Sequence, residues 1–289
     1  MSASTLIQHH ITQHDFSKTT ERIYKKTAEK YGDLDMTHAS YKKIISKVEA
    51  SSTNPNTQAA MLNNIAILVT KDRPDLLKRL IAYREDLART IANHRKNSLK
   101  QLVGTLPTYE ELIGELESLT GVKYIVNYCL IHLGFRNADL NLQYIGKLTD
   151  IPSGEGINYI HLNRKTHEVT MIINQYKTHG TYGTKEIKHN DARLSKELKE
   201  MNLVDGDFLL SLKDGTVPSH STVGDKVMAL SIGKLGETKI VKVVVKHYLD
   251  NKSYEDLENI SKTRGTSIAT LISSYNLYNT NWIEFLACI

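Results

Sequence analysis

Cysteine and long apolar runs are scarce in this sequence, and each scarcity excludes a class of protein. The two cysteines among 289 residues, Cys129 and Cys288, are too few for a disulfide scaffold or a cysteine-rich zinc module, and they suit a reducing compartment. The apolar stretches span only a few residues, so no transmembrane helix is expected. The first residues lack a basic stretch followed by an apolar one, as a secretory signal requires. We therefore expect a soluble, intracellular protein, in the cytoplasm, nucleoid or nucleus, with no membrane partner.

The overall composition is that of an ordinary globular chain. Hydrophobic residues make up 40% of the sequence and charged residues 24%, which is enough to build a core and excludes a fibrous or wholly disordered chain. The length favours one large domain or two modest ones. With 37 Lys plus Arg against 32 Asp plus Glu, the formal net charge is +5.

That charge is concentrated in one segment, residues 71–100. The segment holds nine basic and four acidic residues, so its balance of +5 equals that of the whole chain. Its apolar residues recur at spacings of three and four, which predicts an amphipathic helix with a basic outer face. Such a face is either simply solvated or contacts phosphates, and charge alone does not decide between the two. The candidate DNA-binding residues are Lys71, Arg73, Lys78, Arg84, Arg89, Arg95 and Lys96.

The patterns along the chain divide it near residue 100. Residues 1–100 are predicted to be all helical, and Gly104 and Pro107 mark a linker. Residues 101–289 are predicted to begin with two helices, continue with a small three-stranded antiparallel sheet and end in further helices, which is an α+β organisation. The predicted strands are 158–163, 168–174 and 185–188. The predicted helices of this second part are 108–119, 122–133, 192–201, 222–230, 240–249 and 267–273.

A short pattern around Arg136 carries the most information about function. Gly134 ends a predicted helix with a turn, Arg136 follows two residues later, and Asp139 opens the next helical segment. Leu140 and Leu142 then supply an apolar packing face. This arrangement resembles the first arginine box of the tyrosine recombinases, the phage integrase family.

Two later positions match the same family in the same order. The family places a catalytic lysine in the turn between its second and third strands, where this sequence has Lys177. It places a second arginine box, His-x-x-Arg, at a helix start, where this sequence has Arg264, with Ser261 in the position of the histidine. The resemblance also implies a core-binding DNA domain over residues 1–100 and a catalytic-type domain over 101–289. It implies a catalytic site made of Arg136, Lys177, Ser261 and Arg264.

These residue types suit chemistry at a DNA phosphodiester. Two guanidinium groups can hold the nonbridging oxygens bidentately while negative charge develops on them. A lysine in a hairpin turn can protonate the leaving 5′-oxygen as a general acid. The resemblance implies transesterification on double-stranded DNA through a covalent 3′-phosphotyrosine, with no metal and no other cofactor.

The sequence departs from the family at two places. Ser261 lacks the acid–base capacity of an imidazole. The family continues after its second arginine box with a Gly-His-type motif and the nucleophilic tyrosine, whereas residues 281–289 resemble the helix before that motif. Tyr275 and Tyr278 follow Arg264 too closely to match the nucleophile. We therefore expect a domain that is incomplete at its C-terminus and that cleaves no DNA strand by itself.

Two other functions fit the same residues. One is a catalytically inactive relative that serves as an architectural or structural DNA-binding protein of a mobile element or virus particle. The other is an α+β interaction protein whose arginines are surface residues. His179 and His189 are expected at the surface, since no carboxylate or cysteine spacing completes a metal site. Homo-oligomers on DNA are implied only by the resemblance.

Overall fold

A computed structural model describes residues 2–14, 16, 18–35, 38–69, 73–151, 156–211 and 219–277. The chain divides into two compact units, an N-terminal unit of residues 1–99 and a C-terminal unit of residues 100–289. Each unit has an apolar core of its own. Within the described ranges, none of the helices combines the length and the hydropathy that crossing a membrane would require.

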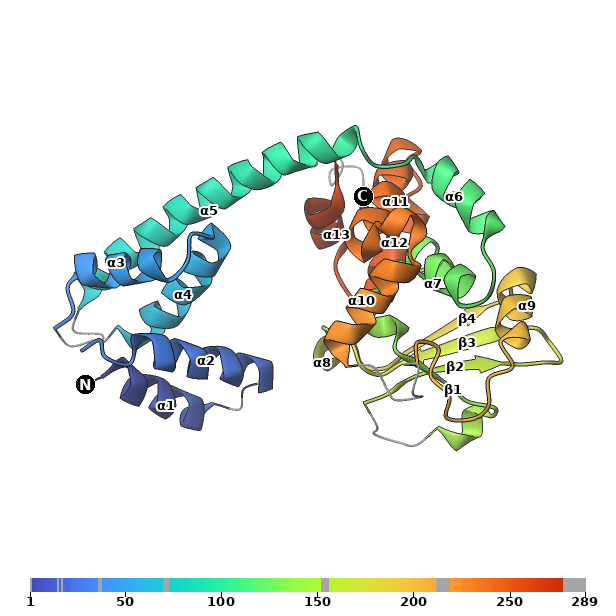
Figure 1. The fold of residues 1–289 in the computed structure, drawn as a ribbon, viewed down its shortest axis with the longest axis horizontal. Helices are drawn as coiled ribbons and strands as arrows, with labels where there is room; N and C mark the ends of the chain where they lie inside the picture. The colour runs from blue at the N-terminus through green and yellow to red at the C-terminus, as the bar shows by residue number, and fades with distance from the viewer. Residues whose placement is uncertain are drawn as a thin grey trace. The chain divides into compact units, whose positions relative to one another are not determined.

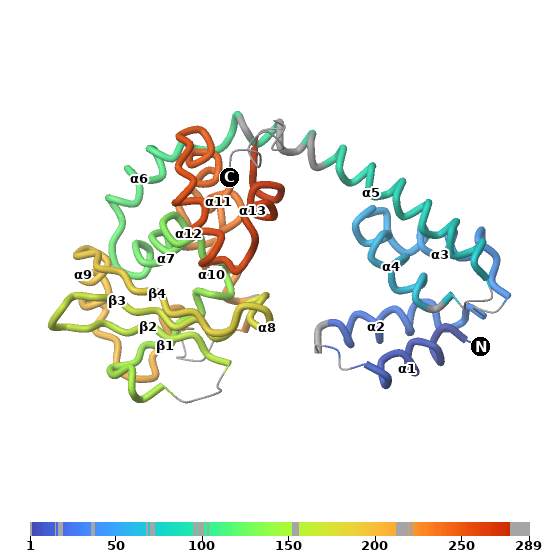
Figure 2. Tube along the Cα trace, turned by 180° about the vertical axis from the view of Figure 1, so that it is seen from behind, coloured from blue at the N-terminus to red at the C-terminus, as the bar shows by residue number. Residues whose placement is uncertain are grey.

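The described N-terminal unit is helical (Figure 2). Apolar side chains from several helices form its core, among them Ile44, Leu62 and Ile65, none of which exposes more than 1% of its surface. Side-chain caps fix where two of these helices begin, because the oxygens of Ser40 and Asn54 accept hydrogen bonds from the first-turn backbone. The helices are α1 (Ala3–Gln13), α2 (Lys18–Tyr31), α3 (Tyr41–Ser51), α4 (Pro55–Leu68) and α5 (Pro74–Val103).

Helix α5 is the predicted basic helix. Pro74 stands in its first turn, where the missing backbone N–H costs nothing, and Gly104 follows its last residue. Leu76, Leu80 and Leu87 are buried in the core of the N-terminal unit. The charged residues between them therefore fall on the outer side of the helix, as the periodicity predicts.

The C-terminal unit is α+β, as predicted from the sequence. Figure 1 shows its longer helices gathered to one side of a small sheet. The α-helices are α6 (Tyr109–Ser118), α7 (Gly121–Ile131), α8 (His179–Tyr182), α9 (Ala192–Glu200), α10 (His220–Leu230), α11 (Gly236–Asp250), α12 (Tyr254–Arg264) and α13 (Ile268–Tyr275). The described residues of this unit also form three 3-10 turns: η1 (Asn137–Leu140), η2 (Leu148–Asp150) and η3 (Ile232–Lys234).

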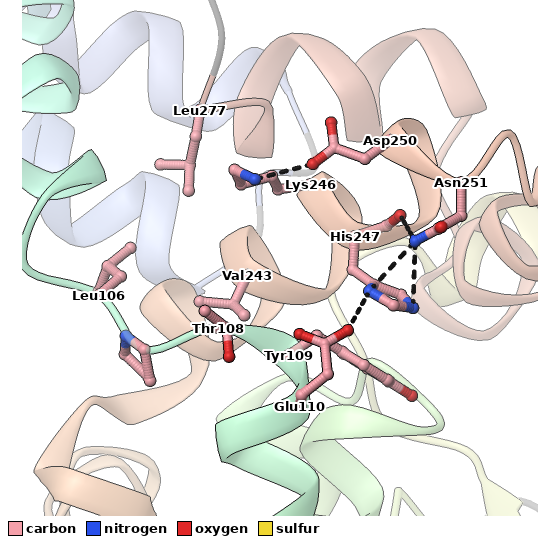
Figure 3. Close-up of a pocket in the computed structure, with 11 residues that line it drawn as sticks. Leu106, Thr108, Tyr109, Glu110, Val243, Lys246, His247, Asp250, Asn251 and Leu277 are labelled. Carbon is pink, nitrogen blue, oxygen red and sulfur yellow. Dashed lines mark hydrogen bonds and ion pairs between the residues drawn. The ribbon is translucent and has the colours of Figure 1, made fainter.

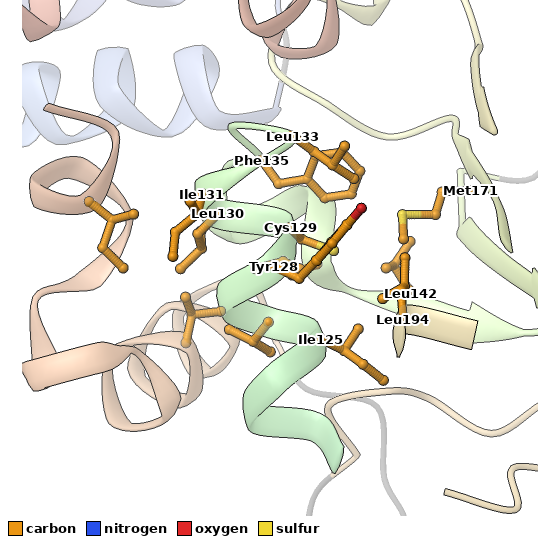
Figure 4. Close-up of a cluster of buried hydrophobic side chains, with 14 of the residues drawn as sticks. Ile125, Tyr128, Cys129, Leu130, Ile131, Leu133, Phe135, Leu142, Met171 and Leu194 are labelled. Atoms are coloured by element: carbon orange, nitrogen blue, oxygen red, sulfur yellow. The ribbon is translucent and has the colours of Figure 1, made fainter. Parts of the chain in front are cut away.

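Helix α7 is the centre of this unit. All residues from Tyr124 to Ile131 are buried, because the helix packs against other helices on one side and against the sheet and α9 on the other. In Figure 4, Leu130 and Ile131 lie on one side of α7, and Met171 and Leu142 lie beyond the other. Cys129 is fully buried among them, and burial strongly raises the pKa of its thiol.

The sheet has four strands in the order β1–β2–β3–β4. The three predicted strands are present as an antiparallel set, with Tyr159 opposite Ile172 and Met171 opposite Ile187. A fourth strand, β1, adds to β2 in parallel. The strands are β1 (Leu142–Tyr144), β2 (Asn158–Leu162), β3 (Val169–Ile173) and β4 (Lys185–His189).

Four of the observed α-helices and strands are not predicted from the sequence. Strand β1 and helix α8 are only three and four residues long, too short for a periodic pattern. Helix α1 and helix α12 are longer but weakly patterned: in α12 only Leu257 and Ile260 are buried apolar residues. The presence of α12 changes the expected position of the second arginine box. Ser261 and Arg264 lie in the last turn of α12 and not at the start of a helix, so that expectation is wrong.

Candidate functional site

Three segments that are distant in the sequence meet at the C-terminal end of α12. The Nζ of Lys185 donates to the carbonyl oxygens of Lys262 (2.9 Å) and Thr263 (2.8 Å), and the Nη1 of Arg136 donates to the carbonyl oxygen of Arg264. The last carbonyls of a helix lack partners within the helix and carry partial negative charge, so they attract cations. The end of α12 thus gathers two basic side chains, one from the turn after α7 and one from β4.

Gly265 makes this convergence possible. It ends α12 in the left-handed conformation with φ +58°, and its carbonyl accepts a hydrogen bond of 2.6 Å from the Thr178 hydroxyl. A Cβ at this position would lie 2.6 Å from the Lys185 Nζ and 2.8 Å from the Tyr176 ring. Only glycine therefore lets the hairpin between β3 and β4 press against the helix end.

Arg136 is half-buried at the turn before η1. Its backbone N–H donates to Asp139 Oδ2 at 2.8 Å, so this acid caps the turn that carries the arginine. The turn is close to α12, because a Cβ on Gly134 would lie 2.7 Å from Ile260 and the glycine has φ +63°. A guanidinium has five N–H donors, and the described part of the chain supplies an acceptor for one of them. The rest are free for a ligand.

Asp139 is a buried acid beside these two cations. Its side chain is 2% exposed, and burial raises its pKa to about 6, although the Arg136 N–H and the nearby positive charges act in the opposite direction. Its second oxygen, Oδ1, is buried and has no hydrogen-bond partner among the described residues. A carboxyl group with a pKa of about 6 loses or gains its negative charge just below neutral pH. That change alters the electrostatic potential at the neighbouring cations.

Lys185 is also perturbed. Partial burial, followed by the positive charge of Arg136, lowers its pKa to about 8, while Asp139 opposes the shift. The ammonium lies 4.0 Å from the centre of the Tyr176 ring and uses two of its three donors on α12. The third donor is available, and a lysine with a pKa near neutral can both hold an anion and give up a proton.

Lys177, the predicted catalytic lysine, lies in a different part of the hairpin from Lys185. Lys177 is exposed in the turn before α8, eight residues before Lys185, and no side-chain contact of Lys177 is recorded among the described residues. The side chain of Lys185, at the start of β4, is the one that reaches the end of α12. The catalytic role of Lys177 stays a prediction.

Arg264 is the largest of the fully buried side chains among the described residues, with no exposed surface. Its Nη1 donates to the carbonyl of Gly134, and its Nη2 donates to Glu237 Oε1 (2.5 Å) and to the Tyr275 hydroxyl (2.6 Å). The other oxygen of Glu237 accepts the backbone N–H of Asn137 at 3.0 Å. Arg264 and Glu237 together therefore tie the Arg136 turn to α12 and α11.

Two residues that bond to Arg264, Glu237 and Tyr275, were not predicted as site residues from the sequence. Ser261, which was predicted, makes a local contact instead. Glu237 looks like an ordinary acid in the first turn of a helix, and Tyr275 stands at the end of α13 with no pattern to mark it. Ser261 is 5% exposed, and its hydroxyl donates to the carbonyl of Thr266 at 2.6 Å, across the turn that follows α12. Its catalytic role stays a prediction.

The candidate DNA-binding residues in α5 and just before it fall into three groups. Arg73 and Arg84 donate to other parts of the N-terminal unit, Arg73 to the carbonyl of Ala39 before α3 at 2.7 Å and Arg84 to Asn63 Oδ1 of α4 at 3.1 Å. Arg89 pairs with Asp86 at 2.8 Å on the surface, and Lys78 is exposed. Lys71 lies outside the described residues, as do the side chains of Arg95 and Lys96. Lys78 and Arg89 are eleven positions apart, about three turns, so they share one face.

A cavity and two histidines elsewhere in the C-terminal unit were also considered as sites. A cavity of about 290 Å³ lies between the start of α6 and the end of α11 (Figure 3). Its polar groups pair with one another: Lys246 with Asp250 at 2.7 Å, and His247 Nδ1 with Glu110 Oε1 at 3.3 Å. His179 is exposed as expected, but His189 is half-buried against Tyr128. In the described ranges, no three His, Cys, Asp or Glu side chains are arranged to hold a metal ion.

Comparisons with solved structures, but not those with family models or curated proteins, find a likeness. No protein-family model matches the chain, and no curated protein matches it. The chain is similar to a solved structure described as the crystal structure of XerA recombinase, with 14% sequence identity over 99% of this chain and 97% of that chain. The TM-score is 0.38. Likeness at this level assigns neither a function nor a role to any residue.

Proposed function

We propose that the protein binds double-stranded DNA and holds one backbone phosphate between Arg136 and Lys185. The observation that carries this proposal is the convergence of these two cations on the end of α12, where each keeps N–H donors that no described residue accepts. A phosphate oxygen is an acceptor that suits both groups, and guanidinium–phosphate hydrogen bonds are charge-assisted. The resemblance of the arginine boxes to the tyrosine recombinases supports the same ligand.

A finer proposal concerns the reaction. If a nucleophilic tyrosine attacks the bound phosphorus, Arg136 would stabilise the charge on the nonbridging oxygens, and Lys185 would protonate the leaving 5′-oxygen. The pKa of Lys185, about 8, is suited to that transfer. The product would be a 3′-phosphotyrosine, with the 5′-hydroxyl strand released, so a recombinase-type strand transfer is the reaction we propose.

One observation favours the second candidate, a DNA-binding relative that does not cleave. Both terminal nitrogens of Arg264 already donate to acceptors within the unit, and the side chain is fully buried. In this arrangement only one of the two expected arginines can reach a phosphate. The architectural role in a mobile element or virus particle belongs to this alternative.

The two candidates differ in one experiment. The chain, extended by a segment that carries the family's nucleophilic tyrosine, is incubated with a nicked duplex that traps a covalent protein–DNA adduct, and the mixture is resolved under denaturing conditions. An adduct that disappears in a Lys185→Ala variant but persists in Lys177→Ala supports strand transfer with Lys185 as the acid. Binding to the duplex without any adduct supports the non-cleaving function, and the absence of binding at low salt contradicts both.

The charge on Lys185 should make DNA binding depend on pH. Because its folded pKa is lowered from 10.5 to about 8, the charge is present below pH 8 and is lost as the pH rises past that value. Affinity for a short duplex should therefore fall by about threefold to tenfold between pH 7 and pH 9, in line with the loss of one phosphate contact. Fluorescence anisotropy at constant ionic strength measures this change. A Lys185→Arg variant should show a flatter profile, and an equal slope in both proteins would contradict the assignment.

The face of α5 that carries Lys78 and Arg89 should contribute affinity without sequence preference. Reversing both charges (K78E together with R89E) should weaken binding to every duplex by a similar factor and lower the salt slope by about 1 for each lost phosphate contact. A matched reversal at the exposed Lys42 of α3 serves as the control. Equal affinity and equal salt slope in the double variant and wild type would identify this face as merely solvated.

A further inference from the structure

The C-terminal unit carries a second surface feature, at the other end of the sheet from Arg136 and Lys185. Strand β2 begins at Asn158, whose side chain donates to the Gln175 carbonyl near the site, and it ends at Leu162. A groove of about 770 Å³ lies beyond that far end. It is formed by the turn between β2 and β3, the segment after β1 and the loop after α9. We call it the sheet-end groove.

The floor of this groove is apolar. Tyr144 and Leu162 are buried beneath it, while Leu148 exposes 37% and Val204 exposes 64% of their surfaces. Val204 is among the most exposed large apolar side chains of the described chain. Single exposed apolar residues are ordinary, but two that line one groove over a buried apolar floor form a small hydrophobic patch.

The loop that presents Val204 is held in place. Asp207 accepts the Val204 N–H at 2.9 Å, and its backbone accepts the Tyr144 N–H at 2.7 Å, so the loop is pinned to the outer edge of β1. Asp205 accepts the N–H of Gly146 across the same edge. The valine is therefore exposed on a fixed backbone, which lowers the entropy that a partner must overcome to bind there.

The rim of the groove is basic. Lys147, Arg164 and Lys165 line it, and no acid of the described residues forms an ion pair with any of the three. The turn that carries Arg164 and Lys165 is rigid, since Asn163 Oδ1 accepts the N–H groups of Lys165 (3.0 Å) and Thr166 (3.3 Å). Asp205, the one acid in the lining, already accepts a backbone hydrogen bond.

We propose that the sheet-end groove binds an acidic segment of a partner protein that inserts an aliphatic side chain between Leu148 and Val204. A hydrophobic centre inside a charged rim is the anatomy of a protein–protein contact. The three basic side chains are complementary to carboxylates. A nucleic-acid backbone would use the basic residues but would gain nothing from the two exposed aliphatic side chains. The inference does not depend on the site at Arg136.

Selection of random peptides displayed on phage against the full chain tests this proposal. The enriched peptides should combine several acids with one or two aliphatic residues. A synthetic copy should bind at least about tenfold more weakly to a Val204→Asp variant, and similarly to R164E with K165E, as expected for the loss of an anchor or of its rim charges. A Lys123→Glu variant, exposed on α7, should bind like wild type.

Three outcomes would overturn it. The selection enriches no acidic peptide, or the enriched peptides bind V204D as tightly as wild type. In the third, the rim reversal weakens binding to duplex DNA while V204D leaves DNA binding unchanged, which would make the groove a nucleic-acid surface. Circular dichroism and thermal melting of each variant separate these results from a loss of folding. If Arg136 and Lys185 prove not to bind a DNA phosphate, the peptide measurements are unaffected.

Discussion

Replacing Arg264 by methionine should lower the free energy of unfolding of the C-terminal unit by about 3–5 kcal/mol, the usual cost of leaving one partner of a buried ion pair uncompensated. The substitution leaves the Glu237 carboxylate without its charged partner. This carboxylate is 13% exposed and lies 2.5 Å from Arg264 Nη2. It also removes the donor to the Gly134 carbonyl, so the turn that carries Arg136 loosens. For a unit of this size, that change lowers the melting temperature by about 10 °C, as scanning calorimetry would record.

A second substitution distinguishes the ion pair from general loss of packing. Removing both charges, Arg264→Met together with Glu237→Met, should restore part of the lost stability, because an apolar pair of similar volume leaves no buried charge. The free energy lost in Glu237→Met alone is measured as well. If the double variant is less stable than Arg264→Met by that whole amount, the two residues act independently. A single variant that melts with wild type would show that Arg264 does not hold the turn.

Replacing Arg136 by alanine should weaken DNA binding by about thirtyfold, or about 2 kcal/mol, the usual net value of hydrogen bonds to a charged group. The salt slope should fall by about 1 to 2 for the same reason. Because Arg136 is half-buried and its side chain makes one hydrogen bond to the described residues, to the Arg264 carbonyl, the melting temperature should change far less than in the Arg264 variant. Fluorescence anisotropy over a salt series measures both quantities.

Arg136→Lys is the informative control for this measurement. It keeps the positive charge but loses the planar fork that matches two phosphate oxygens, so it should recover only part of the affinity. Full recovery would reduce the role of Arg136 to a point charge. Unchanged affinity and salt slope in Arg136→Ala would favour the reading of the chain as an α+β interaction protein whose arginines are surface residues.

Much of the fold could be predicted because it follows apolar periodicity. The strands around Ile160 and Met171 and the basic helix α5 were predicted, as was the α+β organisation that results from them, since each depends on side chains within one element. The turn at Gly134 was predicted because a left-handed residue in that position favours glycine. Helix α12 was missed because its burial depends on two apolar residues and a buried arginine.

The candidate site was harder to predict because it depends on contacts between distant residues. Lys177 and Lys185 belong to the same basic hairpin, and only the register of β4, together with the short helix α8, decides which of them faces α12. Glu237 and Arg264 are 27 residues apart, and neither is apolar, so no periodic signal connects them. The sequence pattern predicted Arg136 as a site residue but not the acid that secures its turn to α11.

The way the end of α12 is capped has a consequence for folding. Its last carbonyls are satisfied by side chains 77, 87 and 128 residues away in sequence, namely Lys185, Thr178 and Arg136. Contacts between residues so far apart in the sequence close long loops, and they form only when most of the unit is already folded. Amide hydrogens around Gly265 should therefore exchange with solvent only through global opening. Separation of Arg136 and Lys185 from the end of α12 and unfolding of the C-terminal unit would then be a single event.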